Sequence, residues 1–153
     1  MDPSESIVTN TQNSDHHQVL LTAMRAADLE DILSGKGPFT VFAPSDSAFE
    51  KLSQEQMETL LKPENKNDLQ ALLRYHIIAG NLSASYILKA MCRGKGTASF
   101  TTVQGDKLIA TMDGIDIVLT DSNGNSARIT TADENQCNGV IHEIDSVFLP
   151  AKI

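Results

Sequence analysis

Two histidines and a serine are the residues of this chain whose types could support nucleophilic catalysis. His142 and His76 each lie within an apolar stretch, and Ser45 is followed directly by Asp46. A hydrolase of this kind needs a hydroxyl that a histidine activates and a carboxylate orients. The chain lacks the Gly-x-Ser-x-Gly elbow that presents such a serine, and Ser45 is better explained as the N-cap of a helix. We therefore expect no enzymatic activity, and the alternative is a small hydrolase that uses His142 or His76 with a nearby serine.

Two other segments contain residue types that bind metals. Residues 121–126 begin like a calcium-binding loop, but the positions where such a loop needs Gly and Glu are occupied by Ser126 and Ala132. His16 and His17 are adjacent, and adjacent side chains on a helix point apart. We therefore predict a hairpin turn at residues 121–126, a solvated helix start at the two histidines, and neither a metal nor a cofactor.

The composition restricts the class of partner. A chain of 153 residues most simply forms one domain. Its 20 acidic and 12 basic residues give a net charge of −8, and without a Lys/Arg cluster it is a poor nucleic-acid binder. No apolar run approaches the length of about 18 residues that spans a membrane, and residues 1–5 lack the basic start of a signal peptide. Cys92 and Cys137 either pair or are both buried and reduced, and the sequence leaves both options open.

The hydrophobic patterns divide the chain into a helical first half and a β-rich second half. Residues 1–13 are polar and are predicted to form a flexible tail. The nearly continuous apolar run at residues 39–44 predicts one early strand that is covered on both faces. After Gly94, short β segments alternate with Asp-Gly and Asn-Gly turns, which indicate hairpins. This order predicts an α+β fold. Apolar stripes with helical spacing lie at residues 19–33, 45–52, 53–61, 68–79 and 83–91.

The closing stretch, residues 138–150, fits both a helical and a strand pattern. Its β-branched residues, the Asn-Gly signal at its start and the proline at its end favour a strand. We expect a bulge or bend near residues 142–145, where the buried face would change.

Three blocks of sequence resemble, in order and spacing, the motifs of the fasciclin domain family. Residues 37–49 are similar to its first signature, residues 73–80 (Leu-Arg-Tyr-His-Ile-Ile-Ala-Gly) to its central Tyr-His motif, and residues 138–150 to its second signature. The resemblance covers about residues 14–150, which we take as a single domain similar in build to bacterial secreted members. It implies a wedge of antiparallel strands packed against a layer of short helices. It also implies that the closing stretch is a strand, and we expect this strand to pair with residues 40–43 at the centre of the wedge.

The same resemblance implies a function outside the cytoplasm. It implies cell adhesion or matrix interaction without catalysis, by a secreted, periplasmic or cell-surface protein. The expected partner is a cell-surface or matrix protein or a polysaccharide, and the expected state is a monomer. A purely structural surface spacer is a further alternative.

In relatives that bind integrins, the Tyr-His region and an Asp-Ile pair before the second signature are implicated in binding. Tyr75 and His76 match the first, and Asp133 matches the Asp of the second, although Glu134 follows it here instead of Ile. His76 lies on an apolar helical stripe, where a hydrogen-bonded core histidine is expected. Tyr75 points elsewhere and is predicted to be accessible for recognition. The signature blocks imply a structural core motif of Phe42, Pro44, Phe49, Asn138, Gly139, Ile141, His142 and Pro150.

Overall fold

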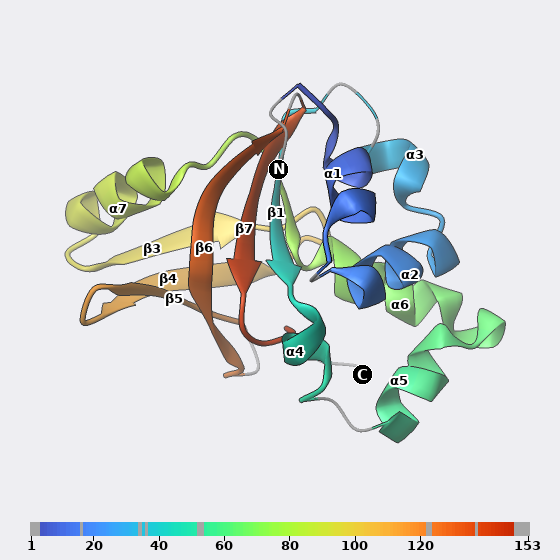
Figure 1. Cartoon of the computed structure of the whole chain (residues 1–153). Coiled ribbons are helices and arrows are strands. Elements are labelled where there is room, and N and C mark those ends of the chain that lie inside the picture. The colour runs from blue at the N-terminus through green and yellow to red at the C-terminus, as the bar shows by residue number, and fades with distance from the viewer. Residues whose placement is uncertain are drawn as a thin grey trace.

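Short helices and a seven-stranded sheet make up the chain, of which the computed structural model describes residues 4–15, 17–33, 35, 37–51, 54–121, 124–136 and 138–148. Most helices gather on one side of the sheet, whereas α7 lies beside β3 at its opposite end (Figure 1). The helices are α1 (Ile7–Asn13), α2 (Gln18–Ala26), α3 (Glu30–Leu33), α4 (Asp46–Phe49), α5 (Gln54–Leu61), the 3-10 turn η1 (Pro63–Asn65), α6 (Lys66–Arg74) and α7 (Ala84–Arg93). The strands are β1 (Phe39–Pro44), β2 (Ile77–Ala79), β3 (Thr97–Thr101), β4 (Lys107–Asp113), β5 (Asp116–Thr120), β6 (Ser126–Gln136) and β7 (Gly139–Ile144).

The first strand and the last strand lie next to each other in the sheet. The strand order is β2-β1-β7-β6-β5-β4-β3, and the β1–β7 pair is parallel while the other five pairs are antiparallel. The predicted pairing of the closing stretch with residues 40–43 is confirmed, since Val41 aligns with Ile141. The predicted α+β wedge of mainly antiparallel strands and short helices is confirmed as well.

An apolar core lies on each side of the two central strands. Alternate residues of a strand point to opposite faces, so Val41 and Ile141 join the core under the helical layer. Phe42 and Ile144 join the second core, which α7 and strands β4 and β5 complete. Because both faces are covered, both strands are nearly continuous apolar runs, as expected for buried strands.

The bulge expected at residues 142–145 lies on the neighbouring strand instead. The register of β6 against β7 shifts between Ile129 and Thr131 and again between Thr131 and Glu134. In each case the extra residue belongs to β6, so β7 keeps its alternation. A bend does follow β7 at Asp145 and Ser146. The expected change of buried face within β7 does not occur, because this strand has a core on both faces.

Residues 7–13 form α1 instead of the flexible tail expected for residues 1–13. Ser6 caps this helix, because its Oγ accepts a hydrogen bond from the backbone N–H of Thr9 (3.2 Å). Ile7 and Val8 are buried in the core under the helical layer. The expectation is wrong for this segment because two apolar side chains and one cap are enough to dock a short helix on an existing core.

Most residues of the expected core motif are buried. Pro150 lies outside the described residues, and Gly139 comes so close to β1 that a Cβ there would stand 1.9 Å from the carbonyl oxygen of Phe39. A side chain at this position would therefore separate the two central strands. The buried members of the motif are Phe42, Pro44, Phe49, Asn138, Gly139, Ile141 and His142.

Candidate functional site

Tyr75 lies at the junction between α6 and β2 and is fully buried. Its hydroxyl donates a hydrogen bond to the carbonyl oxygen of Lys107 (3.0 Å), and its ring centroid lies 6.1 Å from that of Phe148. The prediction that Tyr75 is accessible is therefore wrong. The helix ends at Arg74, so Tyr75 no longer follows the helical stripe and turns into the second core.

His76 is buried beside it and holds two backbone segments together. Its Nδ1 lies 2.8 Å from the carbonyl oxygen of Leu72, and its Nε2 lies 3.0 Å from the backbone N–H of Phe148. A carbonyl only accepts and an N–H only donates, so the network assigns the proton to Nδ1. Burial lowers the pKa of His76 to about 4, against opposing effects from the Leu72 carbonyl and the charge of Asp121. His76 is thus a neutral core histidine, as the helical stripe indicated.

The residues that suggested a hydrolase are engaged in structural contacts. His142 is buried, its Nε2 lies 2.6 Å from the carbonyl oxygen of Leu82, and its ring stacks on Phe42 at 5.7 Å between centroids. Ser45 caps α4, accepting a hydrogen bond at Oγ from the backbone N–H of Ala48 (3.3 Å), which confirms its interpretation as a cap. Each of these hydrogen bonds goes to a backbone atom, so they assemble no serine–histidine pair.

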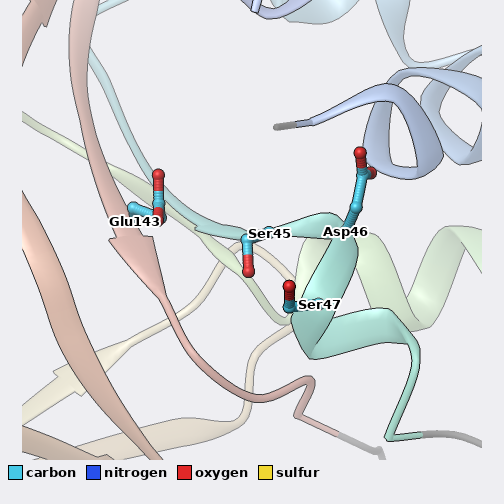
Figure 2. Close-up of a pocket in the computed structure, with 4 residues that line it drawn as sticks. All are labelled: Ser45, Asp46, Ser47 and Glu143. Carbon is cyan, nitrogen blue, oxygen red and sulfur yellow. The ribbon is translucent and has the colours of Figure 1, made fainter. Parts of the chain in front are cut away.

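A polar hollow of about 190 Å³ opens where β7 ends and α4 begins, and Figure 2 shows the four side chains that line it. The Asp46 side chain points away from its serine neighbours toward α2, where Oδ1 accepts a hydrogen bond from the backbone N–H of Val19 (2.8 Å). The other carboxylate of the hollow belongs to Glu143, and its Oε2 lies 3.6 Å from Nε2 of His17. Both carboxylates therefore have structural contacts. The lining residues are Ser45, Asp46, Ser47 and Glu143.

His17 is buried, although the sequence predicted a solvated helix start at His16 and His17. Only 2% of its surface is exposed, and its Nδ1 lies 2.8 Å from the hydroxyl oxygen of Ser14. The helical layer covers this residue because α2 begins directly after it and packs against α4. His16 lies outside the described residues. Within the part of the chain that the structure describes, no group of three or more His, Cys, Asp or Glu side chains could hold a metal ion.

The structure describes the other four residues singled out in the sequence to different extents. Asp121 closes its turn as predicted, since Oδ1 accepts from the backbone N–H of Asn125 (2.8 Å) and Oδ2 accepts from its Nδ2 (3.0 Å). Asp133 belongs to β6, but its side chain lies outside the described part of the chain. Cys92 is exposed on α7, and Cys137 lies outside the described residues, so their pairing stays an open question.

Among the residues whose exposure the structure describes, the most exposed large apolar residue is Ile115, at the tip of the β4–β5 hairpin. It is 95% exposed, and Gly114 before it has a φ of +65°, as the first position of a type II′ turn requires. The Asp-Gly signal at Asp113 predicted this hairpin, and the pairing of β4 with β5 confirms it. The hairpin points away from the helical layer (Figure 1). Sequence reasoning missed Ile115, although an apolar residue in a two-residue turn was a visible signal.

Arg128 on β6 fixes the base of this hairpin. Its Nη2 donates a hydrogen bond to the carboxylate of Asp113. Its Nη1 donates a second one to Oδ2 of Asp116 (3.1 Å). These carboxylates raise the pKa of Arg128, with the hydrogen bond to Asp113 as the largest cause. A planar guanidinium suits such forked contacts. The turn therefore presents Ile115 from a braced frame rather than from a free loop.

Comparison with known proteins identifies relatives over nearly the whole chain. The family model described as "Fasciclin domain" matches residues 15–150. Protein sll1483 of Synechocystis is 34% identical over 149 residues, which are 97% of this chain and 76% of that protein. The uncharacterised protein sll1735 of Synechocystis is 33% identical over 94% of this chain and 97% of its own length. Human periostin is 30% identical over 86% of this chain, which corresponds to 14% of periostin.

A solved structure has the same fold. The FAS1 domain pair from the insect cell adhesion molecule Fasciclin I superimposes with a TM-score of 0.85, at 16% identity, over 98% of this chain and 52% of that one. Among the residues that the structure describes, we find no helix whose length and apolar character would let it cross a membrane.

Proposed function

This chain belongs to the fasciclin domain family, and from this we propose that it is a non-catalytic adhesion or matrix-interaction module that acts outside the cytoplasm. Its contact surface is the β4–β5 hairpin, which we name the Ile115 hairpin and define as residues 113–116. The proposal is supported by the likeness to a domain pair from an insect cell adhesion molecule. The observation that carries it is the 95% exposure of Ile115.

Exposure of this degree is unusual for a large apolar side chain in a tight turn, where polar residues and glycine prevail. Contiguous apolar patches with a polar rim mark interaction sites, whereas a single exposed apolar side chain is common on protein surfaces. The position of Ile115 in a tight turn is therefore what distinguishes it. Here Asp113 and Asp116 provide the polar rim, and both are bound to Arg128. A braced turn loses little conformational freedom when a partner binds, which favours affinity.

The apolar tip also narrows the class of partner. A cell-surface or matrix protein and a polysaccharide were both expected from the family resemblance. An isoleucine side chain gains most from an apolar pocket that excludes water, and proteins offer such pockets more readily than hydrated glycans do. We therefore favour a protein partner. The Tyr-His motif does not contribute directly to this surface, since Tyr75 and His76 are buried.

A bead-adhesion assay tests the proposal. Beads coated with the purified chain are incubated with cells and with extracellular matrix from its source organism, and adhesion is compared with that of bare beads. Ile115→Ser should lower adhesion at least about tenfold, as the loss of a central apolar contact does. The matched control is Ile109→Ser, because Ile109 is also an exposed isoleucine, at 46% exposure, but lies within β4 and not in the turn.

Both variants should keep the melting temperature of the wild type, since surface substitutions change stability little. Wild-type beads that adhere no better than bare beads would contradict the adhesion role and favour a structural spacer. Equal adhesion of the wild type and Ile115→Ser would place the contact surface elsewhere on the domain.

A further inference from the structure

A second surface feature lies away from the Ile115 hairpin, where the helical layer meets the β1–β2 edge of the sheet. It is a pocket of about 170 Å³ between α3, the end of α6, strands β1 and β2, and the turn that joins β3 to β4. Buried core side chains form its floor, since Leu29 and Leu33 are 1% exposed and Ile77 is 5% exposed. The lining residues are Leu29, Leu33, Phe39, Arg74, Ile77 and Val103.

The size and lining of the pocket suit a compact apolar group. A cavity of about 150 Å³ lined by Leu, Ile and Phe in another protein stays dry and takes up benzene. The pocket here has the same side-chain types and a similar volume, but it opens to the surface at Phe39, which is half-buried, and at Val103, which is 44% exposed. An aromatic ring or a branched alkyl group can therefore enter from solvent.

Arg74 supplies a charge at this apolar site. It is the last residue of α6, it is half-buried, and it is the one ionisable residue among the described residues that line the pocket. Two other basic side chains of the helical layer are paired, Arg25 with Glu30 and Lys66 with Asp28. Arg74 takes part in none of the ion pairs found among the described residues. A guanidinium at the edge of an apolar pocket is complementary to a carboxylate, which it can bind with two parallel hydrogen bonds.

The turn that carries Val103 is fixed in place over the pocket. The backbone N–H of Val103 donates a hydrogen bond to the carbonyl oxygen of Ile77 on β2 (2.9 Å). Thr102 is anchored to the carbonyl oxygen of Asp106 through its backbone N–H (2.8 Å) and through its hydroxyl (2.9 Å). An exposed valine is thus held beside the opening, where a bound ligand would cover it.

We propose that this pocket binds a small apolar monocarboxylate, an aromatic or branched-chain acid of about the size of benzoate. The apolar group lies against Leu29, Leu33 and Ile77, and the carboxylate binds Arg74. The site needs no contribution from the Ile115 hairpin. It adds a small-molecule binding activity to the domain, independent of adhesion.

Titration with sodium benzoate, followed by amide chemical shifts in NMR spectra of the whole chain, tests this assignment. A ligand of about nine non-hydrogen atoms in a preformed pocket should bind with a Kd of about 1 mM or lower. The shifts should saturate and should centre on residues 29–33, 74–77 and 103. Benzamide, which is neutral, and acetate, which lacks the apolar group, should each bind at least about tenfold more weakly.

Two variants separate the charge from general effects on the protein. Arg74→Gln should weaken benzoate binding at least about tenfold, whereas the matched control Arg93→Gln, which changes the last-turn arginine of α7, should leave it unchanged. Val103→Asp places a carboxylate beside the opening and should also abolish binding without disturbing the core. Shifts that fail to saturate by about 20 mM, well above the expected Kd, or equal affinities of Arg74→Gln and the wild type would overturn the proposal. Ile115→Ser should bind benzoate normally, so this result does not depend on the adhesion assay.

Discussion

Acidification from pH 7 to pH 4 should destabilise this domain through the protonation of His76. The unfolded chain binds a proton at this histidine with a pKa near 6.5, whereas burial lowers the pKa in the folded protein to about 4. The unfolded state therefore binds more protons than the folded state between these two values. Since stability rises with pH wherever the unfolded state binds more protons, His76 contributes its full stability above pH 6.5 and loses it as the pH falls toward 4.

The size of this loss follows from the difference between 6.5 and about 4. One pH unit of separation between two pKa values corresponds to about 1.4 kcal/mol, so the free energy of unfolding should fall by about 3 kcal/mol. Such a loss is a large fraction of the stability of a small domain. Geometry as well as burial opposes protonation of the folded His76, because a proton on Nε2 would face the backbone N–H of Phe148.

Urea unfolding at pH values from 7.5 to 4, at constant ionic strength, measures this contribution. The comparison is between the wild type and His76→Gln, which cannot gain a proton. The variant should be less stable at neutral pH because it loses a well-placed ring, but its stability should depend less on pH, by about 3 kcal/mol over the range. Carboxylates and the other histidines are present in both proteins, so their effects cancel in the difference. Parallel pH profiles would refute the argument. If the variant does not fold, the NMR signals of the His76 ring in the wild type provide the test instead. A pKa near 6.5 for this ring in the folded protein would also refute the prediction.

Two further predictions concern the signature residues. Asn138→Ala should lower the free energy of unfolding by about 3 kcal/mol, because it removes three hydrogen bonds of a buried side chain, two of them fully buried (to Ile7 and Leu33) and one part-buried (to Gly35). Urea unfolding measures the loss. Faster amide exchange at Ile7 should accompany it, and unchanged exchange would contradict a link to α1. Tyr75→Phe should lower the free energy of unfolding by about 1 kcal/mol, because the hydrogen bond to Lys107 is lost. The same variant should leave bead adhesion unchanged. Normal stability with lost adhesion would instead mean that Tyr75 acts in recognition.

The sequence predicts the centre of this fold better than its edges. Residues 39–44 and 138–144 can be predicted as strands from local sequence alone, since apolar runs bounded by Gly, Asn and Pro indicate buried strands. Ile7 and Val8 give no such signal among polar neighbours. Besides the cap at Ser6, the first turn of α1 is held by Asn138, 131 positions away in the chain. No local sequence pattern indicates a contact over that distance.

The error at Tyr75 has a similar origin. A helical stripe that includes His76 places the preceding residue on another face, and with a single core that face would be solvent. The domain has two cores, and the chain leaves the helix at Arg74, so both Tyr75 and His76 turn inward. The existence of a second core depends on the return of β3–β5 against α7, which residues 73–80 alone do not encode.

The exposed residues of the two proposed sites, Ile115 and Val103, lie outside the three signature blocks, although Phe39, Arg74 and Ile77 of the pocket lie within them. Tyr75, His76, Asn138 and Gly139 match the signatures, and each has a structural contact that other elements of the fold require. A residue that holds two core segments together cannot also change freely to suit a new ligand. Exposed side chains on braced turns have that freedom, because their replacement leaves the core intact. The Ile115 hairpin and the turn at Val103 are both of this kind, the first held by Arg128 and the second by Ile77. The domain therefore combines a fixed interior with short, rigid turns that can be altered one at a time, which is the arrangement that an interaction module needs.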